Sequence, residues 1–363
     1  MFLFATVLLL ASSFACVNVH GFSASVATTT TNAEQLQEYL DQQHGVIRHC
    51  EIGFTKFGRG LVATRDLKAG DVVLRIPTSC ALVEPDLGDD DGEENNHWAG
   101  RLAMQVMKRQ QQQSQQSCAY TNALPEPPCT PSRGDWPETY IKALDDVEFE
   151  NEIDTTMVWR YNQWEQHCGD YVNRTPYLDA LDLVCSRTIR CGNDLLLVPL
   201  LDMANHASQA EGGGYYKRDG ADICLMVGER GVKLGEEVTL DYGQRQNKDW
   251  IIHYGFLPSR NTIESVTLPK SGLKVTLQDA RDATPSLRQE CNDYLQTFTT
   301  SLEEDISMLR DSSKVLDDYR MRMALEYRIA RKTILSAVAG SRASSPFSSA
   351  FSFASSEPDL VVV

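Results

Sequence analysis

The sequence predicts a mixed α+β fold, with short β-strands in the first and middle parts of the chain and helices in an insertion and at the C-terminal end. Residues 50–77 and 195–243 hold short apolar runs separated by turn residues, which is typical of strands. Residues 275–340 instead repeat apolar side chains every three or four positions, which is typical of helices. A length of 363 residues allows one large domain or two moderate ones.

The first elements follow from these patterns in chain order. Residues 33–44 predict a short helix that ends at Gly45, because one face is apolar and glycine favours a helix end. Strands are expected at 61–64 and 72–76, and the residues between them, 66–71, have the composition of a turn.

An insertion of about 84–185 then interrupts the strands. It contains an acidic run at 86–94 and a glutamine run at 110–116, which bury little, so we expect these parts to be disordered. The apolar spacing of 97–109 and the aromatic-rich stretch 138–184 favour helices instead.

Strands return after the insertion. They are expected at 195–200 and 222–227, followed by a turn and strand at 235–243 and a short helix at 247–254. The helical C-terminal part comes next, and the serine-rich tail 341–363 is expected to be disordered.

The N-terminus differs in kind from the rest of the chain. An apolar core at 2–11 is too short to span a membrane, and small residues follow it, with candidate cleavage after Ala15 or Gly21. A hydroxyl-rich stretch comes next, so residues 1–33 resemble the two-part plastid leaders of algae with complex plastids. We expect a signal peptide that leads to such a plastid or to the secretory route. The alternative is an uncleaved, disordered leader on a cytoplasmic protein.

The composition excludes several classes of function. A formal net charge of −16 excludes a uniform basic footprint for nucleic acid and favours basic protein partners. None of the ten cysteines stands in a Cys-x-x-Cys spacing, so we expect free thiols, no metal site and no disulfide framework.

Three short groups of residues, far apart in the chain, are candidates for chemistry. Residues 58–60 (Gly-Arg-Gly) permit a close approach of backbone to a ligand, although a plain hairpin loop has the same composition. Residues 205–206 (Asn-His) follow an apolar run and can hydrogen-bond a ligand, or serve as a turn former and a structural histidine. Tyr242 stands before a glycine, where a core tyrosine would also fit.

The order of these groups resembles the SET-domain protein methyltransferases, in particular the subfamily of the Rubisco large-subunit lysine methyltransferases. The resemblance covers about 45–260. It implies a SET-type β-fold with a pseudoknot, formed by residues 34–260 around the helical insertion. It also implies that 261–340 form a short all-α substrate-binding domain. The chain departs from many relatives at the first glycine loop, which reads Phe57-Gly-Arg-Gly60, whereas they have Glu-Gly before this point.

The resemblance also assigns roles to individual residues. It implies that Tyr242 is the catalytic residue, which aligns the substrate nitrogen. The residues implied to bind the cofactor S-adenosylmethionine are Gly58, Arg59, Gly60, Asn205, His206 and Phe256. The residues implied to line the substrate side are Ser186, Arg187, Asp202 and Tyr254. Taken singly, Phe256 could be a core aromatic, Arg187 a surface salt-bridge residue and Asp202 a helix or turn cap.

We expect S-adenosylmethionine-dependent methylation of a lysine ε-amine in a protein other than a histone, since the cysteine clusters of histone-type relatives are absent. Such an amine has a pKa of about 10.4, so its deprotonation at pH 7 costs roughly 4.6 kcal/mol and calls for a dry channel. Histidine methylation and a non-catalytic binding module remain alternatives. We expect a monomer with a protein substrate, no nucleic acid partner and no membrane span after leader removal.

Overall fold

The structure is a computed structural model that describes residues 32–85, 97–111, 115–169, 173–259, 261–311 and 318–340. It confirms the mixed α+β class. The expected leader up to residue 31, the acidic run 86–94 and the tail 341–363 lie outside the described residues, as does the middle of the glutamine run. No helix of the described part is long and apolar enough to cross a membrane.

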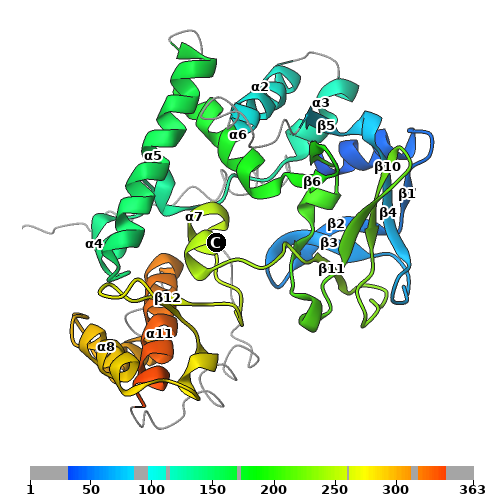
Figure 1. Cartoon of the computed structure of the whole chain (residues 1–363). Helices are drawn as coiled ribbons and strands as arrows, with labels where there is room; N and C mark the ends of the chain where they lie inside the picture. The colour runs from blue at the N-terminus through cyan, green and yellow to red at the C-terminus, as the bar shows by residue number, and fades with distance from the viewer. Residues whose placement is uncertain are drawn as a thin grey trace, which may run out of the picture.

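Two four-stranded sheets lie together at the right of the view in Figure 1, and each combines strands from the first and the middle parts of the chain. The first sheet contains, in spatial order, β1 (Ile47–Arg48), β4 (Val72–Pro77), β10 (Asp222–Met226) and β9 (Tyr215–Asp219). The second contains β2 (Cys50–Thr55), β3 (Gly58–Ala63), β11 (Glu237–Leu240) and β8 (Asn205–His206). Residues more than 140 positions apart are therefore neighbours in both sheets, as in the pair Leu74–Leu225, whose side chains are buried.

A third, three-stranded sheet connects the strands to the insertion. It contains β5 (Leu82–Pro85), β7 (Asp194–Leu197) and β6 (Ile189–Cys191). The helices of the insertion are α2 (Trp98–Gln110), α3 (Gln115–Ala123), α4 (Glu138–Lys142), α5 (Val147–His167) and α6 (Arg174–Arg187). The expected helices at 97–109 and within 138–184 are thus present. A helix over 32–41 also matches the expected one, and its Leu36 and Leu40 are fully buried.

The C-terminal part is largely helical, as expected, but it opens with a two-stranded hairpin. Its elements are β12 (Val266–Thr267), β13 (Lys274–Val275), α8 (Pro285–Leu295), α9 (Leu302–Arg310) and α11 (Tyr319–Ala339). The expectation of an all-α domain was therefore too simple. The reason is that strands of two residues are too short to show an alternating pattern in the sequence.

Helix α7 (Asn247–Tyr254) lies between these parts and contacts both α6 and α11 (Figure 1). It shares one apolar core with the insertion and the C-terminal helix. The buried members of this shared core are Trp136, Leu144, Phe149, Ile153, Ile251, Ile252, Met323, Ala324 and Tyr327. Helix α7 is consequently fixed by packing on two sides. Eight cysteines are free thiols, as expected: Cys50, Cys80, Cys129, Cys168, Cys185, Cys191, Cys224 and Cys291.

Short 3-10 helices complete the described structure. They are η1 (Thr78–Cys80), η3 (Pro131–Arg133), η5 (Leu201–Met203), η6 (Gln209–Glu211) and η7 (Leu277–Ala280). One of them, η5, joins β7 to β8 and carries Asp202.

Candidate active site

The three groups singled out in the sequence meet at the second sheet. Strand β8 pairs in parallel with β11, which sets Asn205 opposite Thr239 and His206 opposite Leu240. The Asn205 amide donates to the backbone oxygen of Arg59 at 3.2 Å. The backbone N–H of Tyr242 donates to Nδ1 of His206 at 3.3 Å. The glycine loop, the Asn-His pair and the tyrosine, remote in sequence, are therefore direct neighbours.

The glycine at position 60 is required by this arrangement. A Cβ atom on Gly60 would lie 2.7 Å from Nδ2 of Asn205 and 3.0 Å from Oε1 of Glu237. The same Asn205 nitrogen donates to Glu237 at 2.8 Å. Any side chain at position 60 would therefore displace the amide of Asn205. Gly58 has φ of +89° with open space around it, so its role is conformational.

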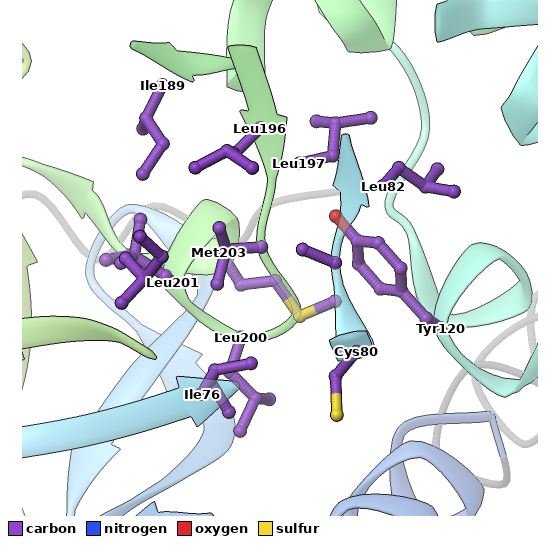
Figure 2. Close-up of a cluster of buried hydrophobic side chains, with 14 of the residues drawn as sticks. Ile76, Cys80, Leu82, Tyr120, Ile189, Leu196, Leu197, Leu200, Leu201 and Met203 are labelled. Atoms are coloured by element: carbon purple, nitrogen blue, oxygen red, sulfur yellow. The ribbon is translucent and has the colours of Figure 1, made fainter. Parts of the chain in front are cut away.

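A strained residue positions the segment between Asp202 and Asn205. Leu200 has φ of +67°, a value that is rare for a bulky side chain, and it is fully buried (Figure 2). The turn at Leu200 starts η5, so that Asp202 faces the protein interior before β8 begins. Burial of the leucine side chain offsets the backbone strain.

An aromatic cluster surrounds His206. The rings of Tyr242, Trp250 and Phe256 lie 5.2, 4.6 and 6.1 Å from the His206 ring, centroid to centroid. Tyr254 lies 5.5 Å from Tyr242 and packs on Trp250 as well. Burial lowers the pKa of His206, so its ring is neutral at pH 7. The cluster therefore offers uncharged aromatic faces.

Tyr242 is the polar group of this cluster. Its hydroxyl donates to the backbone oxygen of Ala204 at 2.6 Å. Burial raises the pKa of Tyr242 to about 12. The phenol therefore stays protonated at neutral pH, and it can orient a substrate group without acting as a base.

A buried charged cluster lies on the other side of Ala204. Asp202 is 5% exposed and accepts a 2.5 Å hydrogen bond from the hydroxyl of Tyr120, while Arg187 donates to its backbone oxygen. Burial raises the pKa of Asp202 to about 6, although Arg187, Tyr120 and Arg59 oppose the shift. The loss of solvation also lowers the pKa of the Arg59 guanidinium. In this cluster burial favours the neutral form of Asp202, and the neighbouring arginines favour its ionised form.

Three polar atoms of the charged cluster are orphaned. Nε of Arg59, Nε of Arg187 and Oδ1 of Asp202 are buried and have no hydrogen-bond partner among the described residues. Buried polar atoms are normally paired, because an unpaired one costs about 1–3 kcal/mol. Because the three side chains interact electrostatically with one another, these two donors and one acceptor suit a ligand that carries both an anionic and a cationic group.

Ser186, the remaining predicted residue, forms hydrogen bonds within its own helix. Its hydroxyl donates to backbone oxygens of Asp182 and Leu183 within α6, so it stabilises the helix that carries Arg187.

Two members of the site, Trp250 and Tyr120, were not predicted from the sequence. Trp250 stood in a correctly expected helix, so its position was visible but its role was not. Tyr120 follows the glutamine run, where no pattern pointed to it.

Comparisons with known proteins agree with this geometry. The SET domain family matches residues 58–243, and the Rubisco LSMT substrate-binding family matches residues 261–335. The actin-histidine N-methyltransferases of Homo sapiens and Otolemur garnettii are each 26% identical over 244 residues, or 60% of this chain. The chain spans 41% and 40% of the length of these two relatives.

Solved structures give the same fold. The SET domain of LSMT bound to lysine and AdoHcy has a TM-score of 0.64 at 16% identity, covering 86% of this chain and 90% of that chain. Rubisco LSMT bound to AdoMet has a TM-score of 0.63 at 17% identity, covering 85% and 91%. Because the SET domain match spans just over half of the chain and a substrate-binding match follows it, this chain belongs to the SET-domain family, with the domain combination of the Rubisco LSMT type.

Proposed function

We propose that this protein is an S-adenosylmethionine-dependent protein methyltransferase that modifies a lysine ε-amine of a protein other than a histone. The observation that carries the proposal is the meeting of residues 58–60, 205–206 and Tyr242 in a protein of the SET-domain family. The match to a substrate-binding family over 261–335 supports a protein as the substrate. In this proposal 34–260 form the SET domain with its insertion, and 261–340 dock the substrate.

The orphaned atoms fit the amino-acid end of the cofactor. S-adenosylmethionine carries an α-carboxylate and an α-ammonium, and when bound it supplies an electrophilic methyl group on its sulfonium. We assign the guanidinium Nε atoms of Arg59 and Arg187 to the carboxylate and Oδ1 of Asp202 to the ammonium. This assignment moves Arg187 and Asp202 from the substrate side, where the resemblance places them, to the cofactor side. Phe256, next to His206, is assigned to the adenine side. Asn205, held between Arg59 and Glu237, keeps the loop at 58–60 in place.

The aromatic cluster suits the transfer step. The amine lone pair forms the new N–C bond as the S–C bond breaks, so the nitrogen must be neutral and in line. The Tyr242 hydroxyl and the backbone oxygen of Ala204 orient the nitrogen without supplying a negative charge that would keep it protonated. The faces of Tyr254 and Trp250 exclude water and stabilise the ammonium that forms after transfer.

Replacement of Tyr242 tests the assignment. In Tyr242→Phe the aligning hydroxyl is lost, so turnover with labelled cofactor and a cell lysate should fall by about 100-fold, while cofactor affinity by calorimetry stays unchanged. Tyr216→Phe is the matched control, because it removes a tyrosine hydrogen bond to the backbone oxygen of Arg190 and leaves the hydrogen bond of Tyr242 to Ala204 in place. Normal turnover in Tyr242→Phe would refute the assignment. Absence of cofactor binding by the wild-type chain would favour a non-catalytic scaffold.

Histidine is the second candidate target. The observation in its favour is the match of 60% of the chain to proteins named actin-histidine N-methyltransferase. A neutral imidazole is abundant at pH 7, so this reaction needs less deprotonation than lysine methylation. Mass spectrometry of the modified peptides decides between the two, because fragmentation assigns the added methyl group to one side chain.

A further inference from the structure

Helix α3 of the insertion reaches the charged cluster at two points. The hydroxyl of Tyr120 donates to Oδ2 of Asp202 at 2.5 Å. At the end of the same helix, the backbone oxygen of Ala123 accepts a 2.5 Å hydrogen bond from the guanidinium of Arg59. Helix α3, which the sequence did not predict, thus contacts two of the three side chains that carry the orphaned atoms.

The surroundings of Tyr120 are apolar. Its side chain is 2% exposed and belongs to the main hydrophobic core. Figure 2 shows it among the side chains of Leu82, Leu197 and Met203. Water cannot serve as a donor to a carboxylate in such a place, so the phenol supplies the hydrogen bond that burial would otherwise remove.

We propose that Tyr120 is a positioning residue of the methyl-transfer site, which holds Oδ2 of Asp202 and turns the unpaired Oδ1 toward a cationic group of the bound ligand. The inference rests on the proposed function, and it assigns to the insertion a direct part in ligand binding. With Oδ2 held by the phenol, only Oδ1 is left to accept from the ligand.

The groups around Asp202 predict the direction in which loss of the Tyr120 hydroxyl shifts the pKa of this carboxyl. The groups that face it are Arg187 on α6, Tyr120 on α3, Arg59 on β3 and Tyr242 after β11. Burial raises the pKa of Asp202 to about 6, and the Tyr120 hydrogen bond is one of the interactions that oppose this rise. Loss of the hydroxyl therefore raises the pKa further, so that less of the carboxylate is ionised at pH 7.

The experiment is calorimetric titration of the full chain with S-adenosylmethionine from about pH 5 to 8, below and up to the pKa of the cofactor's α-ammonium, for wild type, Tyr120→Phe and Tyr177→Phe. Tyr177 is the matched control, because it is also fully buried in the insertion and its hydroxyl donates to the backbone of Gln163 rather than to Asp202. Wild-type affinity should fall as pH drops through about 6. In Tyr120→Phe the midpoint should move up by about one pH unit, since a hydrogen bond to a charged group has roughly that effect. By about pH 8 its affinity should approach that of the wild type at the same pH, where the cofactor ammonium titrates equally for both proteins.

The outcomes separate the two claims. If the wild-type chain binds no cofactor at any pH, the proposed function fails and not the role of Tyr120. If the wild type binds but Tyr120→Phe has the same midpoint, or Tyr177→Phe shifts equally, the role of Tyr120 is overturned. Should Tyr120→Phe not fold, Asp202→Asn replaces it, because that variant has no carboxylate to titrate. An acid midpoint that persists in Asp202→Asn would also overturn the inference.

Discussion

At the scale of single residues, burial decides which side chains are charged. Burial raises the pKa of Tyr242 to about 12 and lowers that of His206, so both are neutral at pH 7. The Nδ1 atom of His206 accepts from the backbone of Tyr242, which requires that this nitrogen carry no proton. Asp202 is the exception in the site, since two arginines and a phenol favour its ionised form.

Glu264 shows the same effect outside the site and predicts a pH dependence of stability. It is 8% exposed and accepts from the backbone of Asn247 at 2.6 Å, at the start of α7. Burial raises its pKa from 4.5 to about 7, so the folded state binds the proton more tightly than the unfolded state. The stability it contributes is fully present below pH 4.5 and is lost as pH rises through about 7.

Replacement by glutamine should remove this dependence. From pH 4.5 to 8, the free energy of unfolding of the wild type should fall by up to about 3 kcal/mol relative to that of Glu264→Gln. Urea denaturation at several pH values measures the difference. Parallel profiles for the two proteins would contradict the prediction.

At the scale of elements, the contact between α5 and α11 joins the insertion to the C-terminal part. Asp146 caps α5 by accepting from the backbone of Phe149 at 3.2 Å. The same carboxylate accepts from the hydroxyl of Tyr327 at 2.6 Å and pairs with Arg331 at 2.8 Å, both on α11. One buried side chain therefore serves a helix end and an interface at once.

Removal of this carboxylate should destabilise the whole chain. Asp146→Ala loses the cap and leaves Arg331 buried without this partner. The free energy of unfolding, measured by urea denaturation, should therefore fall by about 4 kcal/mol. Asp146→Asn is the matched control. It keeps an oxygen for the cap and loses the charge, so its effect should be smaller. Equal effects of the two variants would show that the charge alone matters and that the cap contributes nothing.

The elements also show where sequence reasoning works. Helix α7 was expected at 247–254 and spans Asn247–Tyr254, because eight residues suffice to reveal an apolar face and its glycine end. Strand β8 is only two residues long and depends on its parallel partner, so no local pattern predicts it. For the same reason the meeting of Asn205 with Arg59 followed only from the order of the motifs. Tyr120 stayed hidden because its contact with Asp202 is purely tertiary.

At the scale of the whole molecule, net charge decides which substrates approach. The formal charge is −16, so basic segments of other proteins are attracted at long range. The KM of a basic peptide substrate should rise several-fold as ionic strength increases from about 0.05 to 0.3 M, because the Debye length shortens to less than about 8 Å. The affinity for cofactor, measured in the same buffers, is the control. A KM that does not change with salt would exclude electrostatic attraction as a source of substrate affinity.

The core that α7 shares with the insertion and the C-terminal helix is completed late in the synthesis of the protein. The glycine loop itself is made early, whereas Asn205, which holds it, is made 146 residues after Arg59, and Tyr242 is made later still. Helix α7 is packed only when Met323 and Tyr327 have been made. No shorter nascent chain contains both a complete site and its support. The candidate site therefore gains its full support only after residues 323–327 have been made.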